Sequence, residues 1–145
     1  MTHESALVVV FNHPGESIDS LRRALGLTHS GTVRLIDTLE AEGLVARARS
    51  ARDARAVVLR PTAKGRRRAK RVLATRERTI AQVMGSLDSD QVAALRPVIE
   101  ASLAAMADSP DAARRICALC DETTCRPQGC PVECAVQEAQ HTSAD

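Results

Sequence analysis

Two short amphipathic segments that meet at a tight turn constrain this chain more than any other feature. In residues 17–25 the apolar side chains recur at positions i, i+3 and i+7, which places them on one face of a helix. Gly26 follows, and glycine readily adopts the left-handed conformation that ends a helix. Thr28 is suited to cap a second helix, which Gly43 ends. The pattern predicts two helices joined by a short turn.

The second helix has two distinct faces on a helical wheel. One face predicts a core stripe, made of Thr32, Leu35, Ile36 and Leu39. The opposite face must point outward, and it carries Ser30, Val33, Arg34, Asp37 and Ala41. Polar side chains at the N-terminal end of an exposed helix can read base edges in the major groove of DNA.

Two short runs after this helix predict a β-hairpin. Residues 44–50 alternate apolar and basic side chains, the pattern of a half-buried strand, and residues 56–60 form the partner strand. The polar tip between them carries Arg52 and Arg55, and arginine suits the negative potential of a narrow minor groove. Helix, turn, helix and basic hairpin together predict a winged helix-turn-helix.

The charge of the chain is concentrated in one block. The net charge is only +2, yet residues 46–78 carry +11, between an N-terminal part of −3 and a C-terminal part of −6. Such a block is typical of a surface that binds a polyanion, so we predict double-stranded DNA as the partner. The predicted contacts in the grooves are Thr28, His29, Ser30, Val33, Arg34, Arg52 and Arg55. The predicted contacts to the backbone are Arg22, Arg23 and the arginine block.

The rest of the chain is predicted to be helical, which makes the fold mainly α. Two long helices are expected at about 62–85 and 89–107, and Pro97 is expected to kink the second. A short helix follows near residue 111, and residues 135–145 look frayed. Phe11 is the only aromatic residue, so the core must consist of Ala, Leu, Val and Ile.

Three regions follow from these patterns. Residues 4–60 are predicted to form the winged helix-turn-helix with its two-stranded β-wing. Residues 61–107 are predicted to form long dimerisation helices, and residues 108–145 a cysteine-rich tail that is a metal site or a redox switch.

The turn, the second helix and the hairpin resemble the MarR family of bacterial transcriptional regulators. The residues that carry the resemblance are LGLTHSGTVRLIDTLEAEGLV at 25–45 and RSARDARAVVLRPTAKG at 49–65. Asp53-Ala54-Arg55 matches the D-x-R wing tip of the family, and LRPTAKG matches its passage from the wing into a long helix. The likeness covers about residues 5–107.

The resemblance implies a symmetric homodimer that binds a pseudo-palindromic operator, usually as a repressor released by a small ligand or by oxidation. By position, it implies that Ser30, Val33 and Arg34 read bases. It also implies that Arg55 enters the minor groove and that Asp53 orients Arg55. It does not identify the inducer.

The chain departs from the family pattern in three places. The long N-terminal helix that contributes to the family's dimer is nearly lacking, so either the dimer uses helices 62–85 and 89–107 or the true start lies upstream. Thr32 stands where a larger aliphatic residue is usual. An aromatic-lined pocket cannot be assembled from Phe11 alone, so binding of phenolic ligands is not carried over.

All five cysteines lie within residues 117–134, in the pattern C-x2-C-x4-C-x4-C-x3-C. Four thiolates complete a tetrahedral shell for zinc, with Cys134 as the spare thiol. The predicted zinc ligands are Cys117, Cys120, Cys125 and Cys130. An iron–sulfur cluster and a thiol switch that forms disulfides on oxidation are the alternatives.

The predicted function is sequence-specific DNA binding and transcriptional regulation by a dimer, with no enzymatic activity. The sequence has no signal peptide and no apolar run of membrane length, so we expect a cytoplasmic protein with reduced thiols and no membrane partner. Two other classes stay open. One is a thiol–disulfide oxidoreductase at Cys117 and Cys120, although no βαβ pattern surrounds this C-x-x-C. The other is a protein-binding winged-helix adaptor.

Overall fold

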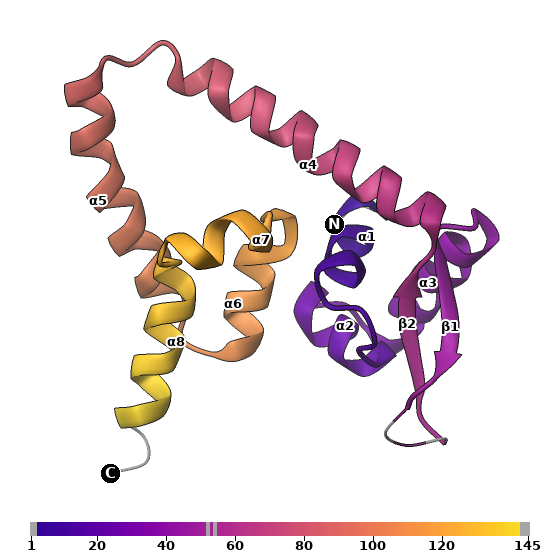
Figure 1. The fold of residues 1–145 in the computed structure, drawn as a ribbon. Helices are drawn as coiled ribbons and strands as arrows, with labels where there is room; N and C mark the ends of the chain where they lie inside the picture. Colours follow the sequence, from indigo (N-terminus) through magenta and orange to yellow (C-terminus); the bar gives the residue numbers. More distant parts are fainter. Residues whose placement is uncertain (1–2, 52, 54, 143–145) are drawn as a thin grey trace. The chain divides into compact units, whose positions relative to one another are not determined.

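The computed structural model describes residues 3–51, 53 and 55–142, and these confirm a mainly helical fold with a two-stranded wing (Figure 1). The elements follow in the order α1 (His3–Asn12), α2 (Ile18–Leu25), α3 (His29–Ala41), β1 (Val45–Arg49), β2 (Val57–Pro61), α4 (Ala63–Met84), α5 (Ser89–Met106), α6 (Pro110–Ile116), η1 (Cys117–Leu119), α7 (Glu122–Cys125), η2 (Arg126–Gln128) and α8 (Pro131–Thr142).

The chain divides into two compact units, which are described separately. The first, here called the winged-helix unit, comprises the described residues up to Leu73 together with Ala118–Cys120. The second, here called the C-terminal unit, comprises Ala74–Cys117 and the described residues from Asp121 onward. Helix α4 therefore begins in the first unit and ends in the second.

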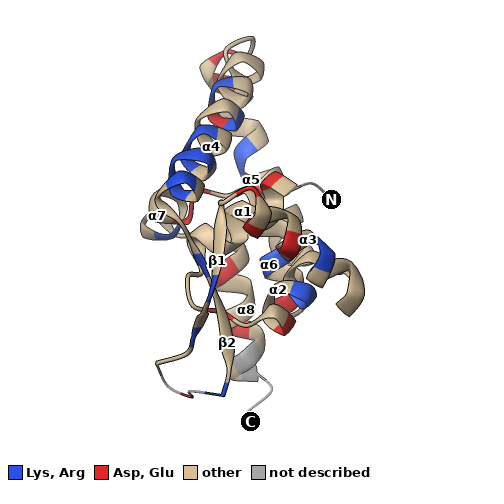
Figure 2. Ribbon diagram, turned by 90° about the vertical axis from the view of Figure 1, so that its right-hand side faces the viewer, with Lys and Arg blue, Asp and Glu red and all other residues tan. Residues whose placement is uncertain are grey.

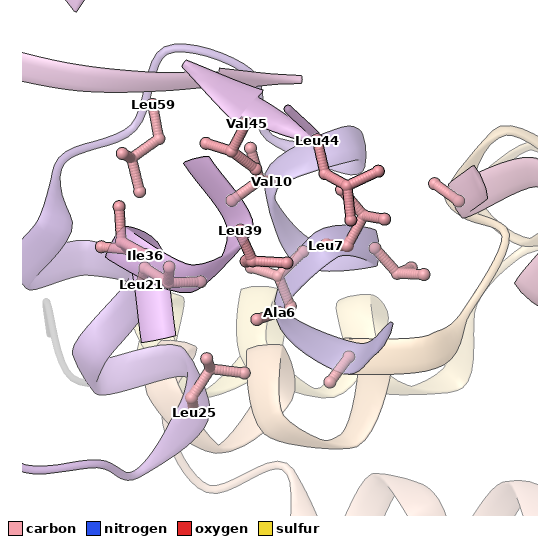
Figure 3. Close-up of a cluster of buried hydrophobic side chains, with 14 of the residues drawn as sticks. Ala6, Leu7, Val10, Leu21, Leu25, Ile36, Leu39, Leu44, Val45 and Leu59 are labelled. Carbon is pink, nitrogen blue, oxygen red and sulfur yellow. The ribbon is translucent and has the colours of Figure 1, made fainter. Parts of the chain in front are cut away.

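The core of the winged-helix unit is aliphatic, as the scarcity of aromatic residues requires. Side chains from α1, α2, α3 and the wing converge on it (Figure 3). Helix α1 is central, because every residue from Ser5 to Val10 is buried, and a helix that is apolar on all sides must be enclosed. Each large aliphatic side chain buried here contributes roughly 1.5–3 kcal/mol relative to an exposed one. The labelled members of the core are Ala6, Leu7, Val10, Leu21, Leu25, Ile36, Leu39, Leu44, Val45 and Leu59.

The turn between α2 and α3 forms as the sequence predicts. The hydroxyl of Ser17 accepts a hydrogen bond from the Ser20 N–H and caps α2. Gly26 ends that helix with a φ of +63°, and the Leu27 N–H donates to the Arg22 carbonyl at 3.1 Å. Leu27 packs against the core, so the turn is held from inside the unit.

The wing pairs β1 with β2 in antiparallel register, from Val45 opposite Pro61 to Arg49 opposite Val57. Val45 is buried and the strand is half-buried, as its alternation predicts. However, the apolar residues of β1 are not all on its buried side, and the basic residues are not all on its exposed side. Ala46 is exposed, whereas Arg47 is only partly exposed and turns back toward α3.

Helix α4 starts against the end of α3. The Thr62 hydroxyl donates to the Gly43 carbonyl at 2.7 Å and accepts from the Gly65 N–H at 3.0 Å. A Cβ atom at position 65 would lie 1.9 Å from the carbonyl oxygen of Leu44. Only glycine allows this close approach of helix and wing.

A short segment of the cysteine-rich tail belongs to the winged-helix unit. Ala118 is 7% exposed and lies in the same apolar cluster as α1, and Leu119 packs against that cluster. The Asn12 side-chain amide donates to the carbonyl of Cys120 at 2.9 Å. The first cysteine pair is thus interrupted by residues that complete the core of the winged helix.

The C-terminal unit has its own small apolar cluster. Ala107, Cys130 and Val132 are buried in it, and α5 packs against α8. The expectation that residues 135–145 are frayed is wrong for the described part, because α8 continues to Thr142. Val132, Ala135 and Val136 lie at i, i+3 and i+4 and pack into the cluster, which holds the helix in place.

Helix α5 begins with the capping box that Asp88 and Gln91 form, and it continues through Pro97. None of its residues is buried. No helix among the described residues is long and apolar enough to cross a membrane.

Candidate nucleic-acid interface

The N-terminal end of α3 is exposed and polar. Thr28, His29 and Ser30 are all exposed there. The Thr28 hydroxyl accepts a hydrogen bond from the Gly31 N–H at 3.2 Å, and it lies 3.4 Å from the Ser30 hydroxyl. The helix start therefore presents hydroxyl groups and unpaired N–H groups, which favour phosphate and base edges.

Arg34 lies one turn further along the same face and is exposed. Its guanidinium makes no ion pair with any residue that the structure describes, so it is available to a ligand. Val33 beside it is half-buried. On the opposite side Thr32 is fully buried, as predicted, and its hydroxyl donates to the Thr28 carbonyl at 3.0 Å.

Asp37, also on the outward face, is bound by the wing. Arg47 on β1 donates to Asp37 at 2.6 Å and to the carboxylate of Glu40 as well. The hydrogen bond that Arg47 donates to Asp37 is the main cause that raises the pKa of Arg47, and Glu40 adds to it. Arg47 thus fixes the wing to α3. Sequence reasoning missed this role, because Arg47 appeared only as one cation in a basic strand.

The wing tip is organised by Asp53. Its carboxylate accepts a hydrogen bond from the Arg55 N–H at 2.9 Å, and its carbonyl accepts one from the Ala56 N–H at 3.0 Å. Asp53 therefore holds the backbone that carries Arg55, whose side chain is exposed. Arg52, another predicted contact, lies outside the described residues.

The two arginines predicted to hold phosphate from α2 are already paired. Arg22 binds Asp19 at 2.8 Å, and Arg23 binds the second oxygen of the same carboxylate. The hydrogen bond from Arg22 lowers the pKa of Asp19, so this carboxylate is ionised at neutral pH. A phosphate at this position would have to compete with Asp19.

The structure joins none of the five cysteines of the tail in a disulfide. Cys130 is buried in the apolar cluster of the C-terminal unit, Cys117 and Cys125 pack against that cluster, and Cys134 is exposed. Among the residues that the structure describes, no group of three or more His, Cys, Asp or Glu side chains is placed to hold a metal ion. Zinc binding by Cys117, Cys120, Cys125 and Cys130 stays a prediction.

Comparison with known proteins agrees with this architecture. The sequence model of the MarR family matches residues 5–56. A MarR family protein from Bacillus stearothermophilus is 27% identical, with a TM-score of 0.61 over 68% of this chain and 70% of that one. Among curated proteins no sequence matches this chain.

Two similar structures contain DNA. Streptococcus pneumoniae FabT in complex with DNA has a TM-score of 0.61 at 20% identity, over 67% of this chain and 68% of that one. The S. aureus MepR–DNA complex has a TM-score of 0.55 at 17% identity, over 71% and 76%. At these identities the likeness concerns the fold. The sequence match to the MarR family model covers the stretch from α1 to the tip of the wing, residues 5–56.

Proposed function

We propose that this protein is a sequence-specific DNA-binding transcriptional regulator. The observation that carries the proposal is the exposed N-terminal end of α3, where Ser30 and Arg34 stand beside a wing whose Arg55 is also exposed. The DNA complexes of FabT and MepR, which share the fold, support it. Regulators of this family are generally not enzymes, and we propose no catalytic role for any cysteine.

Each part of the interface has a proposed role. Ser30, Val33 and Arg34 contact bases in the major groove, because they share the outward face near the helix start. Arg55 enters the adjacent minor groove from the wing tip that Asp53 organises. Thr28 and His29, at the positive end of the helix dipole, contact phosphate. Arg22 and Arg23 contact phosphate only when their ion pairs with Asp19 are broken.

The experiment starts from duplexes recovered by in vitro selection against the purified protein. Arg34→Ala should weaken binding to the selected duplex roughly 5- to 150-fold, because one bidentate base contact is worth about 1–3 kcal/mol. Binding to a random duplex should change little. Arg96→Ala is the matched control, since it removes an arginine that pairs with Glu100 on α5. Failure to enrich any sequence would refute the proposal.

We further propose that the regulator is a homodimer on a pseudo-palindromic operator and acts as a repressor in the cytoplasm. Large apolar side chains are exposed on the second half of α4 and on α5, and such a patch usually marks an interface. The exposed set is Ile80, Val83, Val98, Ile99 and Met106. Regulators of this family are typically dimers. Light scattering should give a molar mass of twice that of one chain. The double variant Val98→Asp with Ile99→Asp should lower the molar mass to that of a single chain.

For the tail we propose a thiol response. Cys130 is buried in one apolar cluster and Cys117 and Cys125 pack against it, so three thiols share one surrounding. A hydroperoxide would oxidise two thiols to a disulfide and leave an alcohol and water. Zinc or an iron–sulfur cluster on Cys117, Cys120, Cys125 and Cys130 is the competing proposal. Elemental analysis and a UV–visible spectrum of anaerobically purified protein distinguish the two proposals. One zinc ion per chain, or bound iron with a charge-transfer band, would overturn the thiol response.

A further inference from the structure

We infer that the first half of α4 carries a second surface for nucleic acid, which holds the phosphate backbone of a duplex other than the one that α3 reads. The surface consists of Arg67, Lys70 and Arg71, and is here called the α4 cation surface. The inference rests on the proposed function and adds to it. A unit with two such surfaces can hold two DNA segments together.

The α4 cation surface lies near the C-terminal end of α3, whereas the first duplex is proposed to bind at the N-terminal end. Helix α4 starts where α3 finishes, because Thr62 binds the Gly43 carbonyl and Lys64 donates to the Glu42 carbonyl at 2.7 Å. Helix α3 has 13 residues and is therefore roughly 20 Å long. The major groove is only about 8.5 Å deep, so a helix that enters by its N-terminus leaves its far end outside.

The position of the wing also places α4 away from the proposed DNA contacts. Helix α4 follows β2 at the base of the hairpin, whereas the residues proposed to contact DNA lie at the tip. Figure 2 shows the blue of Lys and Arg gathered along α4, away from the tip of the wing. The densest positive charge of the chain is thus separated from the reading face within the winged-helix unit.

The three side chains point away from the core. Gly65, Ala69 and Leu73 form the buried side of α4. At about 100° per residue, Arg67 and Arg71 lie nearly opposite that side. Lys70 lies between the two sides, and all three cations are exposed.

These cations also lack partners, in contrast to their neighbours. Lys64, Arg66 and Arg68 bind the Glu42 carbonyl, the Pro61 carbonyl and the Glu4 carboxylate, respectively. Within the described part of the chain, Arg67, Lys70 and Arg71 make no ion pair or hydrogen bond through their side chains.

No acidic residue occurs between Asp53 and Glu77, so the first half of α4 offers these cations no partner on the helix itself. Arg67 and Arg71 are instead like charges at i and i+4, an arrangement that destabilises a helix. A bound polyanion would remove this repulsion.

A duplex backbone fits the surface better than a membrane or a base edge. The outward side of this helical segment has no large apolar side chain, which an interfacial membrane helix requires. The three cations span about one helical turn of α4, and contacts from such a surface to phosphates carry no sequence information. Recognition would therefore be independent of sequence and would depend on salt through counterion release.

The test is capture of a second duplex. A selected duplex is immobilised, saturated with the full-length protein and exposed to a fluorescent 30-base-pair duplex of random sequence. The wild type should retain the fluorescent duplex, with a salt slope of about −3 in the logarithmic plot if three phosphates are neutralised. The variant R67A/K70A/R71A should lose capture at least tenfold and bind the selected duplex within threefold of wild type. The variant R67K/K70R/R71K should retain capture, and circular dichroism checks folding.

The outcomes separate the two proposals. If the wild type binds the selected duplex but captures no second one, the inference fails and the proposed function stands. If no sequence is selected at all, the proposed function fails. If the alanine variant loses selected-duplex binding as strongly as capture, the α4 cation surface holds the first duplex and the inference is overturned. Release of the fluorescent duplex by phosphatidylserine vesicles, and not by neutral ones, would assign the surface to a membrane and also overturn it.

Discussion

Arg47 connects the two elements that are proposed to read DNA. It lies on β1, and its guanidinium binds Asp37 and Glu40 on α3. Without Arg47, each carboxylate would present uncompensated negative charge near the proposed DNA contacts. Arg47 therefore both orients the wing and neutralises part of the recognition helix.

We predict that Arg47→Ala weakens DNA binding at least tenfold and lowers the free energy of unfolding by about 1 kcal/mol, the scale of partly exposed ion pairs. Fluorescence anisotropy and urea denaturation measure the two effects. Arg96→Ala breaks a comparable pair with Glu100 on α5 and should leave DNA affinity unchanged. Wild-type affinity in Arg47→Ala would show that the wing needs no such attachment.

A second residue, Asp19, holds Arg22 and Arg23 away from other anions. We predict that Asp19→Asn strengthens DNA binding and steepens the logarithmic salt slope by up to about 2, because two arginines become available to phosphate. Arg22 lowers the pKa of Asp19 in the folded state, so the pair is intact above the ordinary aspartate range and is lost as pH falls below it. The difference between variant and wild type should therefore be constant from pH 8 to about pH 5. A slope that stays at the wild-type value would contradict the prediction.

At the level of elements, the helix-turn-helix could be predicted because its signals are local. The caps at Ser17 and Thr28, the glycine at position 26 and the buried Thr32 all act within a few residues of one another. Arg47 could not be placed in the same way, because its partners lie 7 and 10 residues earlier on another element. Helix α8 was missed because its apolar side chains are few and need the cluster around Cys130 to become a buried face.

Gly65 is a second position at which a local sequence pattern cannot predict the effect of a contact between distant elements. Helix propensity alone predicts that alanine at this position of α4 stabilises the protein by up to about 1 kcal/mol. The structure predicts the opposite sign, because a Cβ atom would lie 1.9 Å from the Leu44 carbonyl oxygen. We expect Gly65→Ala to destabilise the winged-helix unit by about 1–3 kcal/mol, the usual scale of overpacking.

Urea denaturation of Gly65→Ala checks the sign directly. The exposed Ala74→Gly on the same helix calibrates the propensity effect and should cost about 1 kcal/mol. If Gly65→Ala proves more stable than wild type, the close approach of α4 to β1 is wrong.

At the scale of the whole molecule, one short segment of the cysteine-rich tail, Ala118–Cys120, belongs to the winged-helix unit. The sequence suggested a tail that begins at residue 108, yet Ala118 and Leu119 pack with the core that α1 organises. The hydrogen bond between Asn12 and Cys120 joins residues 108 positions apart, a separation that no local pattern can reveal. A chemical change at Cys120 would therefore take place within the unit that is proposed to read DNA.

We predict that Ala118→Asp destabilises the winged-helix unit, because the new carboxylate would be buried in the apolar cluster of α1 without a partner. Hydrogen exchange of the α1 amides should accelerate, and affinity for the selected duplex should fall. Asn12→Ala, which removes one hydrogen bond at 2.9 Å, should cost only about 1 kcal/mol and shift the same amides in the same direction. Gln128→Asp is the control, since it adds the same charge to an exposed position of the tail and should leave α1 unchanged. If Ala118→Asp alters exchange only in α6 to α8, the tail does not complete the winged-helix core, and regulation through its cysteines would need another route.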